Sequence, residues 1–129
     1  MRSLLPEGWP RPRGYSNGVL ADGATVFVAG MIGWNQDQEL ASGFVAQFRQ
    51  ALRNTVDVLA EAGAGPEHVA RMTWFVTDLD AYRDNLVEVG EAYRDVMGKH
   101  FPAMAVVGVT GLVEPEAMIE IESTAVVRR

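Results

Sequence analysis

The chain has 129 residues, of which 48% are hydrophobic and 22% charged, a balance typical of one soluble globular domain over residues 1–129. The formal net charge of −6 disfavours nucleic acid as a partner, because phosphate binding requires clustered Lys and Arg. The sequence contains no cysteine, which excludes disulfides, thiol nucleophiles and thiolate metal sites.

The N-terminal segment MRSLLPEGWP reaches Pro6 and Glu7 before any apolar run develops, a pattern that differs from a signal peptide. No uncharged apolar stretch approaches the roughly 20 residues that cross a bilayer. We therefore expect a cytoplasmic protein that makes no membrane contact.

The first 18 residues are rich in proline and glycine and predict an irregular arm. Two short β-rich runs follow, at residues 19–21 and 25–29. The Asp22-Gly23 pair between them is a strong local signal for a hairpin turn, so we expect the two runs to pair with each other.

Apolar side chains recur at steps of three and four between Phe44 and Ala62. This spacing predicts an amphipathic helix, with Ser42 as its candidate N-cap and Gly63 as its stop. Residues 69–77 then form a strand by their β-branched and aromatic content.

Asp80 is a candidate cap for a second amphipathic helix, which is expected to end at Gly98. Pro102 opens a strand over residues 103–109, and residues 117–127 form the last strand. Each helix is apolar on one side only, so both must lie on one face of the sheet. This predicts an α+β two-layer sandwich, with a mostly antiparallel or mixed sheet of about six strands.

The second face of this sheet is expected to be covered. A half-solvated antiparallel sheet alternates apolar and polar residues, but the strands at 71–77 and 103–109 do not alternate cleanly. With no helix left to cover that face, another subunit is the simplest cover, and we expect a homo-oligomer.

The last strand places Glu120, Glu122 and Thr124 on one face and isoleucines on the other. If the carboxylates lie on the covered face, desolvation raises their pKa and makes them useful proton shuttles near neutral pH. The alternative is an exposed strand face with surface ion pairs, which is the commoner situation for acidic residues.

The two histidines are expected to have structural roles. His68 lies in a connector, and His100 follows Lys99 at a helix end, where cations complement the helix dipole. Neither has an acidic residue at ligand spacing, so we predict no metal site. The sequence also lacks HExxH and a strand–GxGxxG–helix context.

Several segments together resemble the YjgF/Rid family of enamine and imine deaminases, over roughly residues 13–127. The segments are RGYSNGV, VFVAGMIG, VAQFRQALRNTVDVLAEAGAGPEHVARMTWFVTDLD, FPAMAVVGV and IEIESTAV. The resemblance implies a chorismate-mutase-like fold, a trimer with sites between subunits, and hydrolysis of an enamine or imine to a carbonyl compound and ammonia without a cofactor.

The resemblance also implies roles for individual residues. Glu120 would position water and move protons, Tyr15 would line the pocket, and Gly30 would offer backbone contacts, as would backbone groups near Val106. Phe101, Met104 and Val106 are expected to border the same cleft as Glu120, and Met31 is a further candidate for substrate binding.

Four positions depart from the family pattern. Met104 stands where the deaminases of 2-imino acids place an arginine that forks onto the substrate carboxylate, and a thioether cannot replace that donor. Ala29 and Met31 stand where Ser and Gln are usual, and Gly90 replaces an Asn.

Two hypotheses follow from these departures. The first is an active deaminase for another substrate, with the carboxylate held by Arg13, Lys99 or His100. It resembles the branch that includes 2-aminomuconate deaminases of aromatic-compound degradation. The second is a family member that has lost deaminase activity and binds a small ligand or a protein partner.

Overall fold

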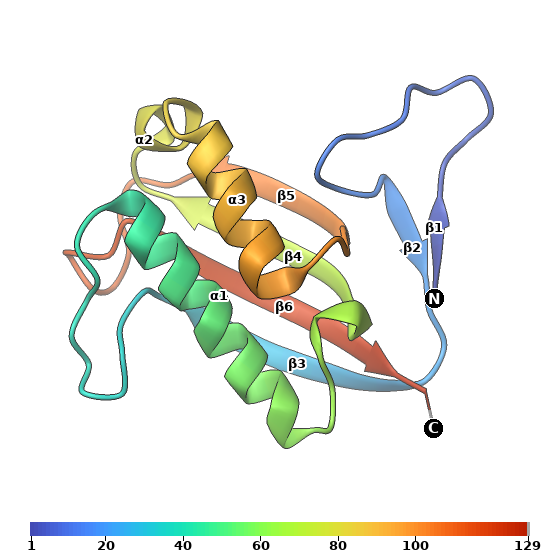
Figure 1. Ribbon diagram of the computed structural model, residues 1–129, viewed down its shortest axis with the longest axis horizontal. Coiled ribbons are helices and arrows are strands. Elements are labelled where there is room, and N and C mark those ends of the chain that lie inside the picture. The colour runs from blue at the N-terminus through green and yellow to red at the C-terminus, as the bar shows by residue number, and fades with distance from the viewer. Residues whose placement is uncertain (129) are drawn as a thin grey trace.

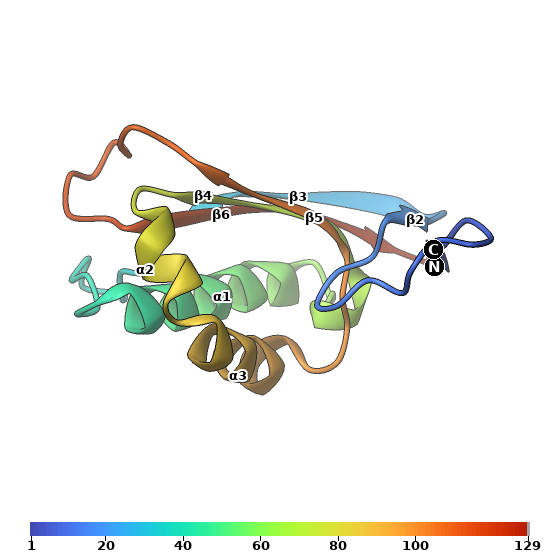
Figure 2. The same ribbon diagram turned by 90° about the horizontal axis from the view of Figure 1, so that it is seen from above.

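A four-stranded mixed sheet forms one layer of the molecule, and the helices form the other (Figure 2). The computed structural model describes residues 1–128. Across the sheet the strands run in the order β3 (Ala24–Met31), β6 (Ile119–Val127), β4 (Val69–Val76) and β5 (Ala103–Gly108). β6 is antiparallel to both of its neighbours, whereas β5 is parallel to β4 and forms one edge.

The two long helices, α1 (Phe44–Glu61) and α3 (Leu86–Met97), lie side by side on one face of the sheet (Figures 1 and 2). A short helix α2 (Leu79–Arg83) precedes α3, and a 3-10 turn η1 (Pro66–His68) precedes β4. The predicted two-layer α+β sandwich with its helices on one face is therefore confirmed.

The core lies between the helices and the inner face of the sheet. Its fully buried side chains include Phe48 and Leu52 of α1, Met72 of β4, and Ile119 and Ile121 of β6. Burying each such side chain contributes about 1.5–3 kcal/mol, so this face dominates the stability of the fold. The opposite face carries no helix, and Phe27 on β3 is 80% exposed there.

The predicted hairpin around Asp22-Gly23 is wrong. β2 (Gly18–Leu20) pairs with a further strand, β1 (Arg2–Leu4), in a separate two-stranded sheet, and β3 pairs with β6. Gly23 adopts φ +148° and lies so close to β6 that a Cβ would be 2.3 Å from the Val127 carbonyl oxygen. The pair therefore carries the chain from one sheet to the other. The first 18 residues are accordingly not an irregular arm throughout, and the six strands divide four and two between separate sheets.

The predicted caps also need correction. Gly43 is the N-cap of α1 and offers no side-chain bond, so Ser42 does not cap the helix. The second helix is divided into α2 and α3, and Asp78 caps α2 by accepting hydrogen bonds from the amides of Asp80 and Ala81. Asp80 instead lies in the first turn.

Candidate functional site

Glu120 and Gly30 lie together on the open face of the sheet. Glu120 is opposite Phe75 in the β4–β6 ladder, on the side away from the helices. Gly30 lies where the β3–β6 register shifts between Val28 and Met31, as in a β-bulge. A Cβ on Gly30 would be 2.7 Å from Glu120 Cδ and 2.8 Å from Oε2, so the carboxylate packs directly against the glycine backbone.

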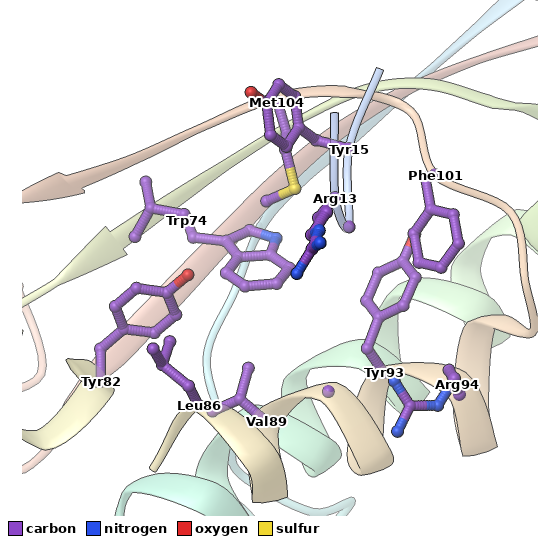
Figure 3. A pocket seen from close by; sticks show the side chains of 13 residues that line it. Arg13, Tyr15, Trp74, Tyr82, Leu86, Val89, Tyr93, Arg94, Phe101 and Met104 are labelled. Atoms are coloured by element: carbon purple, nitrogen blue, oxygen red, sulfur yellow. The ribbon is translucent and has the colours of Figure 1, made fainter. Parts of the chain in front are cut away.

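A cavity of about 490 Å³ opens on the other side of the sheet, beside the edge strand β5 (Figure 3). The N-terminal segment, β4, β5, α2 and α3 all contribute to its wall. The residues that line it are Arg13, Gly14, Tyr15, Trp74, Tyr82, Leu86, Val89, Gly90, Tyr93, Arg94, Phe101, Met104 and Val106.

Ser16 fixes the N-terminal segment against the start of β5. Its amide donates to the Pro102 carbonyl at 2.9 Å, and its hydroxyl donates to the Phe101 carbonyl at 2.5 Å. Ser16 also forms an isolated parallel bridge with Ala103. These bonds of Ser16 fix the backbone next to Tyr15. They therefore position the Tyr15 side chain, a predicted pocket residue, in the cavity wall.

Within a single chain, Met104 and Val106 lie on the opposite face of the sheet from Glu120, so one protomer does not form the cleft that they are expected to border together. Met104 and Val106 are in register with Met72 and Trp74, whose side chains are buried on the helix side. Glu120 belongs to the opposite face, because successive residues of a strand point to opposite sides. Of the predicted residues, Arg13, Tyr15, Phe101, Met104 and Val106 lie in the cavity, and Gly30 and Glu120 on the open face.

Three other predicted binding residues lie elsewhere. Met31 is opposite the buried Ile121 and packs against the core, away from Glu120. Lys99 and His100 line a separate hollow beside the N-terminal segment. The His100 ring lies with Nε2 2.8 Å from the Val69 carbonyl oxygen, which gives it a structural role.

Sequence reasoning missed Trp74, Tyr82 and Arg94 as cavity residues. Trp74 is only 5% exposed and packs in the core, but it also contributes to the cavity wall. Arg94 folds back along α3 over Gly90, where a Cβ would lie 3.2 Å from the Arg94 Nη1. Two positions of α3, one turn apart, offered a signal for this part of the cavity. Gly90 departs from the family pattern, and Arg94 carries a charge.

The cavity is electropositive and aromatic. Its lining includes two guanidinium groups, those of Arg13 and Arg94, and no carboxylate. Within residues 1–128, neither guanidinium has a carboxylate oxygen within 4.0 Å. Burial raises the pKa of the Tyr93 phenol above its usual value, and this hydroxyl donates to the His100 carbonyl. Tyr93 is therefore a neutral donor.

No cluster of three or more His, Cys, Asp and Glu residues suited to a metal ion occurs in the part of the chain that the structure describes. Across those same residues, no helix has the length and apolar character needed to span a membrane.

The family model described as Endoribonuclease L-PSP matches residues 10–127. A RutC family protein from Aquifex aeolicus is 36% identical over 129 residues, covering 98% of this chain and 99% of its own. The human protein named 2-iminobutanoate/2-iminopropanoate deaminase is 33% identical over 114 residues, covering 87% of this chain and 79% of its own.

Among solved structures, the Rid family protein YyfB from Yersinia pestis superimposes with a TM-score of 0.85 at 33% identity, covering 98% of both chains. The fold thus has close structural counterparts. The chain belongs to the Endoribonuclease L-PSP family, also called the YjgF/RutC/Rid family.

Proposed function

We propose that the protein is a cofactor-independent hydrolytic deaminase, which converts an enamine or imine to a carbonyl compound and ammonia. The observation that carries the proposal is the packing of Glu120 against Gly30 on the open face of the sheet. Relatives named as deaminases at about a third identity support the reaction class.

The chemistry requires little more than a positioned water and a group that moves protons. Water adds to the electrophilic imine carbon, and Glu120 accepts a proton from that water as the C–O bond forms. With the imine protonated on nitrogen, this addition gives a neutral carbinolamine. Glu120 returns its proton to the nitrogen, the C–N bond breaks and ammonia leaves, and the new hydroxyl gives up its proton to Glu120 as the C=O bond forms. An enamine substrate first takes up a proton on carbon to give the imine.

The two halves of the site would meet between copies of the chain. The cavity and Glu120 lie on opposite faces of one protomer, so a substrate in the cavity reaches a carboxylate only from a neighbour. The open face carries the exposed Phe27 and Val107, which a neighbour would bury. We propose a homotrimer, the assembly that the family resemblance implies.

The substrate is proposed to differ from a simple 2-imino acid, because Met104 offers no guanidinium to a carboxylate. 2-Aminomuconate, or a related enamine carboxylate, is the candidate that the sequence resemblance suggests. Of the cations considered for its carboxylates, Arg13 lies in the cavity, whereas Lys99 and His100 do not.

The direct test is ammonia release by the purified protein from freshly generated 2-iminopropionate and from 2-aminomuconate, compared with the uncatalysed rate. We expect acceleration of at least one substrate. Acceleration of neither would contradict deamination of these substrates and favour the alternative, a family member that binds a ligand or partner without turnover.

A further inference from the structure

The indole of Trp74 carries a donor that the fold leaves unused. The side chain is 5% exposed, and its Nε1 has no hydrogen-bond partner among the residues that the structure describes. A buried donor without an acceptor costs about 1–3 kcal/mol, so native proteins rarely retain one without a reason. The side chains beside the nitrogen indicate what could serve as its acceptor.

Figure 3 shows the Trp74 nitrogen on the edge of the indole that faces Arg13 and the Met104 thioether. Both are flexible side chains, and Arg13 is exposed on the N-terminal segment. The nitrogen is buried in the free chain, so an acceptor reaches it only when one of these side chains changes rotamer. An acceptor at this place would also lie beside the Arg13 guanidinium, which favours an anion.

Aromatic rings form the rest of this part of the cavity. The Trp74 ring lies 6.4 Å from Tyr82 and 6.1 Å from Tyr93, and Tyr93 stacks on Phe101 at 5.6 Å. The cavity volume of about 490 Å³ is within the roughly 300–1,000 Å³ typical of pockets for larger organic ligands. A substrate with a methyl side chain would leave most of this apolar surface wet.

We propose that the cavity selects 2-imino or 2-enamino carboxylates with a planar aromatic or unsaturated side chain, and that Trp74 Nε1–H donates to their carboxylate. This inference rests on the proposed function for the identity of the reacting group. Trp74 and Arg13 together take the anion that the family arginine holds elsewhere, and the rings accept the planar side chain. Met104 leaves room for that side chain, where an arginine would fill it.

Binding of stable 2-oxo acids, the products of such substrates, tests the inference without turnover. The chain has three tryptophans, so ¹H–¹⁵N spectra give three indole signals, and Trp74→Phe assigns one of them. We expect phenylpyruvate to shift the Trp74 indole signal and to bind at least about tenfold more tightly than pyruvate. An unmoved signal, or equal affinity for the two acids, would overturn the inference.

Trp74→Phe keeps a ring but removes the donor, so we expect phenylpyruvate to bind about tenfold or more weakly. Trp9→Phe, at an exposed position, is the matched control and should bind as the wild type does. Because Trp74 is buried, Arg13→Gln supplies a second variant outside the core, with weaker binding again expected. Unchanged affinity in both Trp74→Phe and Arg13→Gln would contradict the proposal.

Turnover separates this inference from the proposed function. The imines of phenylalanine and alanine, generated in place by an amino-acid oxidase, should differ in kcat/KM in favour of the phenyl compound. Trp74→Phe should raise KM for both imines with little change in kcat, because both carry the carboxylate that the indole binds. If neither imine is deaminated but phenylpyruvate shifts the Trp74 signal, the proposed reaction fails and the binding site stands. If both are deaminated without preference, the reaction stands and the inference fails.

Discussion

The carboxylate of Glu120 packs so closely against Gly30 that a methyl group on the glycine would lie 2.7 Å from the Glu120 Cδ. Gly30 does not have positive φ, so glycine is required here by space and not by backbone strain. The bulge at the end of β3 and the carboxylate of β6 thus form one unit, and this unit can be tested at either residue.

Gly30→Ala should displace the Glu120 side chain while leaving the fold intact. We expect kcat/KM for deamination to fall about 100-fold, as for a catalytic group misplaced by about 1 Å, and the free energy of unfolding to change by under about 1 kcal/mol. Gly111→Ala is the control, because Gly111 has no atoms within 4 Å of a built Cβ and no positive φ. Equal loss in both variants would contradict a specific role for Gly30.

Glu120→Gln keeps the size of the side chain but removes its ability to exchange protons. We expect ammonia release to fall about 10²–10⁴-fold, the contribution of one general acid–base group. Glu122→Gln lies two residues along the same strand face and should retain wild-type rates. Full activity of Glu120→Gln, measured under the same conditions, would refute the mechanism even if deamination itself is observed.

Met104→Arg introduces a guanidinium beside Trp74 in the cavity. We expect kcat/KM for 2-iminopropionate to rise about tenfold, because a charged donor then holds the carboxylate of a small substrate. The longer side chain fills space beside the rings, so binding of phenylpyruvate should weaken. Met97→Leu, a core substitution on α3 outside the cavity lining, serves as control. No gain with the small substrate would show that the pocket differs more widely.

Tyr93→Phe tests the pH dependence of stability. Burial raises the pKa of Tyr93, so the folded protein keeps the phenol protonated at pH values where the unfolded chain, with a pKa of about 10, releases the proton. The wild type therefore loses stability above about pH 10, by up to about 1.4 kcal/mol per pH unit from this group.

The variant loses the bond to the His100 carbonyl and should be about 1 kcal/mol less stable at pH 8. The variant has no phenol to ionise and so does not lose this stability at alkaline pH. The difference in free energy of unfolding between the two proteins should therefore shrink or reverse by pH 11. Urea unfolding at both pH values measures this difference. A difference that stays constant from pH 8 to pH 11 would contradict it.

Phe27→Lys tests whether copies of the chain cover the open face. Phe27 is exposed in one protomer, and a lysine there would place a charge in the apolar contact. We expect the molar mass in solution, measured by light scattering, to fall from that of a trimer to that of a monomer. Val58→Lys, on the outer side of α1, should leave the mass unchanged. A wild-type protein that is monomeric at micromolar concentration would contradict the proposed assembly.

The sequence predicted the elements whose signal is local and repeated. The apolar stripe predicted the C-terminal end of α1 to within one residue, because the same spacing of apolar side chains recurs in every turn of the helix. The hairpin prediction from Asp22-Gly23 was wrong because this pair indicates only that the chain turns, and not which strands pair on either side of the turn. The true partner of β3 is β6, at the other end of the chain.

The same limit explains the candidate site. Alternation along one strand correctly separated Glu120 from the isoleucines of β6, but relating Glu120 to Met104 requires the register across β4. Trp74 shows the complementary limit. A large aromatic side chain in an apolar strand is expected to be buried. The surroundings of its nitrogen, in contrast, depend on Arg13 and Met104, which are distant in sequence and meet only in the folded chain.

The separation of the cavity and Glu120 onto opposite faces has a consequence for any assembly in which they meet. Each contact must join two different surfaces, head to tail, and in a trimer three such contacts close into a ring. Every subunit then serves two sites, giving its cavity to one and its carboxylate to the other. A variant inactivated at Glu120 and a variant whose cavity is blocked would therefore restore each other's activity when their subunits are mixed, because some sites in the hybrid ring receive both intact halves.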